Sequence, residues 1–179
     1  MNPIKSFLAL AATFCVSILY AEDNNTYIKQ QVAYKDQSAN GKELTWDFGM
    51  LSPINEEYTV AYSIPDSNYM HQWCATEHRT RYYYTLTADT IWRTGYENPT
   101  TFVQYTQPEA VLRLPLRYGD TLTTTFAAKG EYGHRIPMIL SGTNTIEVDA
   151  QGKLILPDKT YEQVLRVHSQ RQYVESGLD

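Results

Sequence analysis

Hydrophobic and polar side chains alternate most regularly in the run TNTIEVDAQGKLILPDKTYEQVLRVHSQRQY, residues 143–173. A period of two predicts strands, because successive side chains of a strand point to opposite faces of a sheet. Strands are predicted over residues 143–148, 154–156 and 164–173. Tight turns are predicted between them, at residues 149–152, where glycine allows positive φ, and at residues 157–160, where proline ends the ladder. Reversals this close in sequence favour an antiparallel meander.

The same alternation recurs upstream. Leu44, Trp46 and Phe48 share one face of a predicted strand, and residues 69–81 are predicted to be a short helical turn or an irregular crossover. Further strands are predicted over residues 58–64, 82–87, 91–96, 102–105, 112–116, 122–128 and 136–140, with turn signals between them. Many short strands indicate an all-β fold: an antiparallel meander forming an open or closed barrel, with a β-sandwich as the alternative. An open edge would allow edge-strand association.

Three longer runs carry a resemblance. They are GKLILPDKTYEQVLRVHSQRQY, RLPLRYGDTLTTTFAAKGEYG and YYYTLTADTIWRTGYENPTT. Together they resemble an uncharacterised domain of secreted proteins from Bacteroidetes-type bacteria, often found with a type IX secretion sorting segment, and the likeness covers about residues 44–173. The resemblance implies fold and location, without an assigned activity. Members usually continue with another strand, so this chain is expected to be either truncated or a shortened member, and it lacks the sorting segment.

The beginning of the chain predicts export. Residues 1–21 are predicted to be a signal peptide, with a basic residue at Lys5, an apolar core over residues 7–20 and the small Ala21 before the cut. A buried N-terminal helix and a lipid anchor at Cys15 are the alternatives. The predicted organisation continues with an N-terminal tail or edge strand over residues 22–40, one β domain over 41–173 and a C-terminal tail over 174–179. The protein is expected in the periplasm, the outer envelope or outside the cell, without a transmembrane segment after cleavage.

Charge and cysteine content narrow the partners. The formal net charge is −5, and removal of residues 1–21 with their single lysine would make it −6. An acidic domain without a basic cluster argues against nucleic acid as a partner. Only Cys74 would remain after cleavage, so no internal disulfide is expected.

No catalytic, cofactor or metal site is predicted. His71, Cys74 and His78 have suggestive spacing, but no matching second pair completes a zinc site. The nucleophile-elbow, zinc-protease and phosphate-loop motifs are absent from the sequence. The paired carboxylates of a hydrolase could come from Glu131, Glu147, Asp149 and Glu162, but Glu147 lies on a solvent-type face and Asp149 in a predicted turn. We therefore expect a protein that is not an enzyme. A hydrolase is the less favoured alternative.

The aromatic content is the feature that bears on function. The chain has 15 Tyr and 3 Trp, and three tyrosines are consecutive, so they must point to both faces of a sheet. We expect a structural or interaction domain; the alternative is a binding module for a glycan or a lipid-like ligand. The candidate ligand-facing aromatics are Trp73, Tyr82, Tyr83, Tyr84 and Trp92. Burial of all three Trp would favour the structural domain, whereas aromatics gathered on one concave surface would favour binding.

Overall fold

The computed structural model describes residues 10–11, 26–28, 40–52, 59–63 and 73–177, which contain strands and no helix. The all-β prediction is therefore confirmed. The strands are β1 (Leu10–Ala11), β2 (Thr26–Ile28), β3 (Gly41–Asp47), β4 (Thr59–Ser63), β5 (Trp73–Glu77), β6 (Thr80–Thr87), β7 (Thr90–Asn98), β8 (Thr101–Arg113), β9 (Thr121–Tyr132), β10 (Ile136–Ile155) and β11 (Thr160–Gly177). No described helix is long and apolar enough to cross a membrane.

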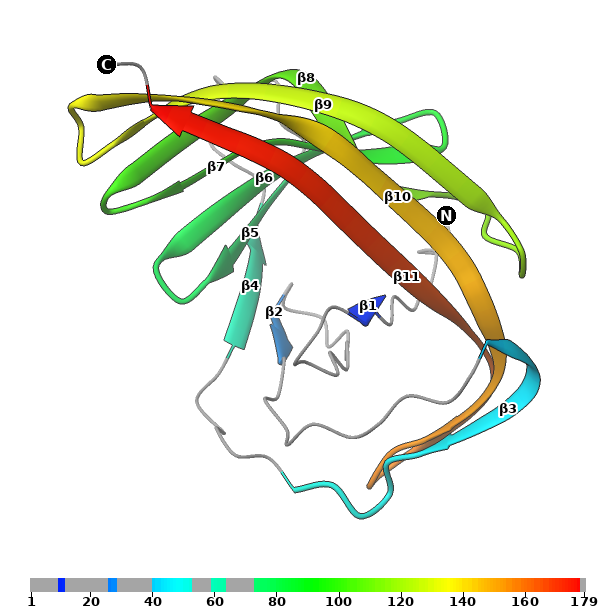
Figure 1. Ribbon diagram of the computed structural model, residues 1–179. Coiled ribbons are helices and arrows are strands. Elements are labelled where there is room, and N and C mark those ends of the chain that lie inside the picture. Colours follow the sequence, from blue (N-terminus) through cyan, green and yellow to red (C-terminus); the bar gives the residue numbers. More distant parts are fainter. Residues whose placement is uncertain (1–9, 12–25, 29–39, 53–58, 64–72, 178–179) are drawn as a thin grey trace.

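All the described strands belong to one sheet, in the order β1-β11-β10-β9-β8-β7-β6-β5-β4-β2, with β3 beside β10. From β4 to β11 each strand pairs antiparallel with its neighbour in sequence, which confirms the meander. The sheet arches strongly and leaves a concave face (Figure 1). Its edges are β1 and β2, so the barrel is open rather than closed. Two pairings are parallel, β3 with β10 and β1 with β11.

The prediction of a turn at residues 149–152 is wrong. β10 continues through this segment as one strand of 20 residues, with irregular register between Val148 and Ala150 and between Gly152 and Leu154. The chain does not reverse at Gly152. Glycine is needed there because the backbone of Leu44 on β3 lies so close that a Cβ would collide with it. The extra residue at the bulge therefore bends β10 instead of ending it.

Two further sequence predictions need correction. Residues 73–77 form β5 and not a helical turn or crossover, and residues 69–72 lie outside the described part of the chain. The segments predicted at 102–105 and 112–116 are largely one strand, β8, which ends at Arg113 before a cis Leu114–Pro115 bond. The predicted turn at residues 118–120 is present, and Gly119 adopts a φ of 88° there.

The described apolar core is divided along the sheet. Where β8, β9 and β10 pack, it contains Val103, Tyr105, Phe126, Ala128, Met138 and Leu140. Where β8, β10 and β11 pack, it contains Leu112, Ile146, Val148 and Val167. Around β3 and β10 it contains Trp46, Phe48, Ala150 and Leu156, whereas near the β4 edge the buried cluster consists of Val60 and Ala75. The core is thus deepest under β8 to β10 and thinnest under β4 and β5.

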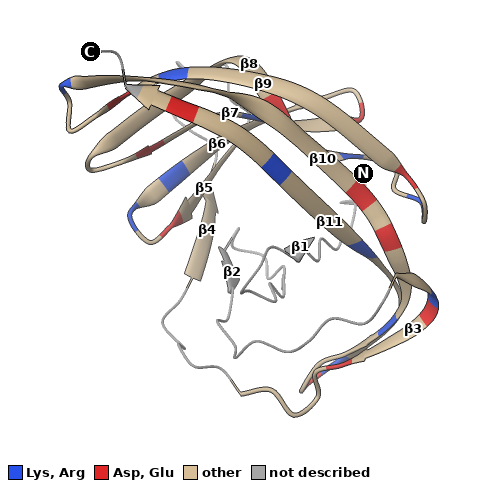
Figure 2. Cartoon of the chain, viewed as in Figure 1, with Lys and Arg blue, Asp and Glu red and all other residues tan. Residues whose placement is uncertain are grey.

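Both ends of the described chain lie at the sheet edges or beside them. Leu10–Ala11, inside the predicted signal peptide, pairs with Val167–His168 of β11, and β2 pairs with β4 at the opposite edge. β11 continues to Gly177, beyond the predicted domain boundary. The signal peptide and edge-strand association stay predictions. Acidic and basic residues occur as scattered short bands along the strands and near the hairpins (Figure 2).

Candidate functional site

The candidate site lies where β8 separates from β9. Pairing between these strands ends at Gln107 and Ala127, whereas residues 109–113 of β8 remain paired only with β7. Pro108 at the separation point has no N–H to contribute to a ladder. The Asn144 side chain of β10 donates to the Ala110 carbonyl at 2.9 Å, which satisfies a backbone acceptor that β9 does not reach. The sheet bends here without leaving that acceptor unpaired.

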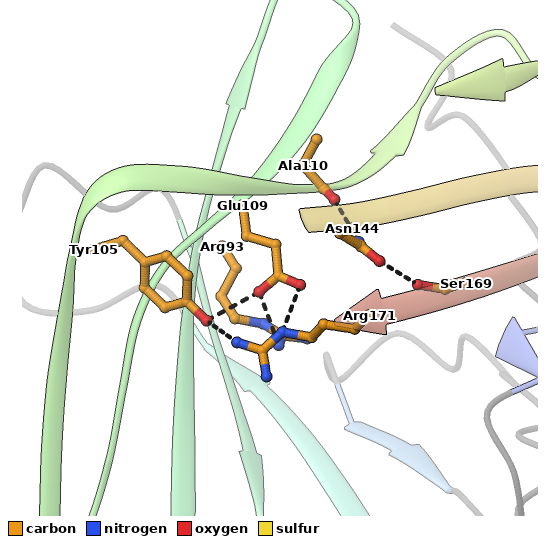
Figure 3. A network of polar contacts seen from close by, with 7 residues as sticks. All are labelled: Arg93, Tyr105, Glu109, Ala110, Asn144, Ser169 and Arg171. Carbon is orange, nitrogen blue, oxygen red and sulfur yellow. Dashed lines mark hydrogen bonds and ion pairs between the residues drawn. The ribbon is translucent and has the colours of Figure 1, made fainter. Parts of the chain in front are cut away.

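Glu109 is the centre of this site, with only 2% of its side chain exposed. The Tyr105 hydroxyl donates to Glu109 Oε2 at 2.9 Å, and Arg93 Nη1 donates to the same oxygen at 3.4 Å. Arg171 Nε lies 2.9 Å from Glu109 Oε1, and Arg171 Nη2 donates to the Tyr105 hydroxyl oxygen at 3.0 Å. Figure 3 shows the four side chains converging from β7, β8 and β11.

The curvature of the sheet brings these residues together. In a flat sheet β8 and β11 would lie roughly 14 Å apart, being three strand spacings from each other. Arg171 crosses this distance over the ring of Phe126 on β9, with its guanidinium carbon 4.5 Å from the ring centre. The site therefore belongs to the concave face, where the arch shortens the path between strands that are not neighbours.

The two guanidinium groups are held between aromatic rings. Arg93 lies 5.6 Å from the ring centre of Tyr82 and 5.9 Å from that of Tyr84. Arg171 lies 4.4 Å from the ring centre of Tyr173. Such cation–π contacts favour the charged form and fix the position of the side chain. Both arginines nevertheless stay partly accessible, at 23% and 26% of their side chains.

Burial and charge set the protonation of the site. Burial raises the pKa of the Tyr105 hydroxyl to about 12, and the Glu109 carboxylate adds to the rise. Burial alone would lower the pKa of Arg93, but Tyr84, Glu109 and Tyr105 around it raise that pKa overall. At neutral pH Tyr105 is therefore a neutral donor, and Arg93 is a cation.

A second polar contact extends the site along the same face. Ser169 Oγ of β11 donates to Asn144 Oδ1 at 2.9 Å, so Asn144 joins β8, β10 and β11. Asn144 is buried at 2% exposure, and both ends of its amide have partners (Figure 3). Because a buried amide without partners would cost stability, this arrangement fixes the position of β11 relative to β8.

Three of the candidate aromatics lie together on the concave face. Trp73 stacks on Tyr84 with 4.5 Å between ring centres and is tilted against Tyr62 at 5.7 Å. Tyr82 packs against Tyr96 at 6.2 Å. All five side chains are partly exposed. We call Tyr62, Trp73 and Tyr84 the aromatic row; it crosses β4, β5 and β6 and ends beside Arg93.

The other two candidates lie on the opposite, convex face. Tyr83 follows Tyr82 in the strand, so it points outward, and its hydroxyl donates to Glu97 at 2.7 Å. Burial, followed by the bond to Glu97, raises the pKa of Tyr83 to about 12. Trp92 precedes Arg93 and donates to the Thr87 hydroxyl at 2.7 Å. The structure therefore divides the candidate set between two faces.

The remaining candidate chemistry is dispersed. Among the described residues, no three His, Cys, Asp or Glu side chains are placed to hold a metal ion, and His71 lies outside that part of the chain. Burial raises the pKa of the Cys74 thiol, which makes a thiolate less accessible. Of the proposed carboxylates, Asp149 is paired with Arg166 at 2.7 Å and Glu162 with Lys153 at 3.0 Å.

The sequence reasoning missed the polar centre of the site. Arg93 lies two residues after Ile91, so both side chains point to the same face of the strand, and Ile91 packs against the core. A charged residue on the core-facing side of a strand was a signal of a polar site that the sequence alone provided. Glu109 gave no such signal. Glu109 shares the odd-numbered phase of the buried Val103 and Tyr105, but the bulge between Tyr105 and Gln107 interrupts the alternation just before it.

Comparison with known proteins provides no relative. No protein-family model matches the chain, and no curated protein or solved structure matches it significantly. No enzyme family is therefore indicated. The resemblance to a secreted Bacteroidetes-type domain and the exported location stay predictions.

Proposed function

We propose that the protein is a non-enzymatic binding module that holds a glycan on the concave face of its sheet. The aromatic row is the observation that carries this proposal: Tyr62, Trp73 and Tyr84 pack ring against ring across β4, β5 and β6 and remain partly exposed. Flat aromatic surfaces beside fixed polar groups are typical of sites for small polar ligands with apolar ring faces. Glu109 and its two arginines supply those polar groups next to the row.

A glycan fits this face better than a lipid-like ligand. The concave surface near Arg93 combines aromatic rings with guanidinium and hydroxyl groups, whereas a lipid tail requires a continuous aliphatic lining. A purely structural domain is supported by Trp46, which is buried at 9%, but not by Trp73, which is partly exposed. The partial exposure of Trp73 therefore favours binding over scaffolding.

Intrinsic tryptophan fluorescence and calorimetry of the protein with a panel of soluble oligosaccharides test this proposal. Trp73→Ala removes the central ring of the row and should weaken binding by about tenfold or more, which corresponds to about 1.4 kcal/mol. Trp92→Ala is the matched control, because Trp92 is a partly exposed tryptophan on the convex face. It should leave the affinity unchanged.

Thermal melting of both variants checks that the fold is retained. Equal losses in both variants, or no affinity for any oligosaccharide, would contradict the proposal and leave the structural domain. If the protein bound dodecanoate but no sugar, and only the Trp73 variant lost this binding, the ligand of this face would be lipid-like and not a glycan.

A further inference from the structure

The charges at the centre of the concave face do not cancel. Arg93 and Arg171 are two cations, and both are paired with one anion, Glu109. The cluster therefore has one excess positive charge. Buried or half-buried charges are costly unless they are paired, so an excess cation at this position favours an anionic partner.

The accessible part of the cluster is its cationic part. Glu109 has 2% of its side chain exposed, whereas Arg93 and Arg171 keep 23% and 26%. A guanidinium has five N–H donors. Arg93 makes a long 3.4 Å bond to Glu109 and a bond to Tyr105, while its buried Nε has no partner. Glu109 is therefore the most buried member of the cluster, and the exposed area belongs to the two arginine side chains.

Among the described residues, Glu109 is the carboxylate that forms ion pairs with Arg93 and Arg171. Glu175 follows Arg171 by four residues on β11, and Glu77 follows Trp73 by four residues on β5, so each is about 13 Å farther along its strand. Asp149 is already bound by Arg166, through two hydrogen bonds of 2.7 and 3.0 Å.

We infer that the glycan held on this face is an acidic one, a sugar of the uronic acid class whose carboxylate binds Arg93. This inference rests on the proposed function and names the class of its ligand. Arg93 lies 5.9 Å from the ring centre of Tyr84, which stacks on Trp73. A pyranose ring packed on the aromatic row thus places a ring carboxylate beside the guanidinium, whose planar fork matches a carboxylate.

The test compares two forms of one ligand, oligogalacturonate and its methyl ester, by calorimetry on the unmodified protein. The two differ only in the esterified carboxylate and its charge, so no folding defect can produce a difference between them. The free acid should bind about tenfold or more tightly than the ester, and added salt should reduce the difference.

Arg93→Gln should weaken binding of the acid more than binding of the ester, so that the ratio of the two affinities falls toward one. Arg113→Gln is the matched control: Arg113 is an exposed arginine paired with Asp89 at 3.6 Å, and its loss should leave the preference intact. Equal affinities for acid and ester would overturn this inference while the glycan proposal stands. Affinity for neither form, together with no affinity for neutral oligosaccharides, would overturn both.

Discussion

Tyr105 shows how one side chain links burial to charge in this protein. It is exposed by only 7%, it donates to Glu109, and it accepts from Arg171. Loss of its proton would place a phenolate 2.9 Å from a carboxylate inside the fold. The hydroxyl donates to Glu109 only while it is protonated. The stability of the site is therefore expected to fall at alkaline pH.

We expect stability to fall between about pH 10 and 12 through Tyr105. The unfolded chain releases this proton near 10, whereas the folded protein holds it to about 12, so the contribution is complete below pH 10 and is lost as the pH rises. One proton corresponds to about 1.4 kcal/mol per pH unit, or roughly 2–3 kcal/mol over this range. Urea unfolding at successive pH values measures the slope.

Tyr105→Phe should reduce that slope by the contribution of one proton and leave the part that comes from Tyr83, whose pKa burial also raises to about 12. It should lower stability at neutral pH, because Glu109 loses a donor. Tyr132→Phe removes an exposed phenol, at 52% exposure, and is the control. If the Tyr105→Phe variant kept the same alkaline slope as the unmodified protein, Tyr105 would have to ionise equally in both states.

The side chains of the site differ in how far the sequence alone predicts their positions. Alternation within one strand separates Tyr82 and Tyr84 from Tyr83, and this was readable without a structure. The convergence of Arg171 with Glu109 was not, because it depends on the curvature of the whole sheet, which brings β11 toward β8 (Figure 1). Local pattern predicts which way a side chain points, but not what it meets.

At the scale of elements, β10 shows why the sequence predicted the all-β class of the fold but not the boundaries of its strands. Its alternation is clear, but Asp149 to Gly152 has the composition of a turn, and the structure makes it a bend within one strand. The difference arises from partners distant in sequence: Arg166 binds Asp149, and the backbone of Leu44 lies against Gly152. Turn chemistry is local, whereas the pairing that overrides it is not.

Gly152→Ala should separate β3 from β10, because the new methyl group would collide with the Leu44 backbone. The expected cost is about 1–3 kcal/mol, as for other overpacked sites. Urea unfolding measures the cost. A red shift of the fluorescence of Trp46, buried at 9% beside this pairing, would report the detachment of β3.

Gly133→Ala is the matched control. A Cβ at Gly133 would meet no atom within 4 Å, and its φ of 59° adds backbone strain only in the β9–β10 turn. This variant should lose some stability without the Trp46 shift. A Gly152 variant with unchanged stability and unchanged fluorescence would mean that β3 moves aside at no cost.

At the scale of the whole molecule, the bend at β8 divides the sheet into two parts that differ in the size of their buried apolar clusters. The side formed by the first half of β8 with β9 and β10 contains a buried cluster of six residues, whereas the buried cluster at the β4–β5 end consists of Val60 and Ala75. Past Gln107, the described part of β8 has no backbone pairing with β9, and side chains such as Asn144 hold it to the rest of the sheet on that side. The aromatic row lies on the side of this division with the smaller buried cluster, so a ligand bound there would stabilise the part of the sheet with the fewest buried contacts.

Native-state hydrogen exchange should therefore show earlier opening of β4 to β6 than of β9 and β10, because the free energy of local opening follows buried apolar contact. Val60→Ala should speed exchange in β4 to β6 alone, since Val60 belongs to the small cluster. Leu140→Ala, in the large cluster, should lower global stability by about 2–5 kcal/mol and speed exchange throughout the sheet. Uniform protection from β4 to β10 in the unmodified protein would show that the bend transmits stability fully, and that the sheet unfolds as one unit.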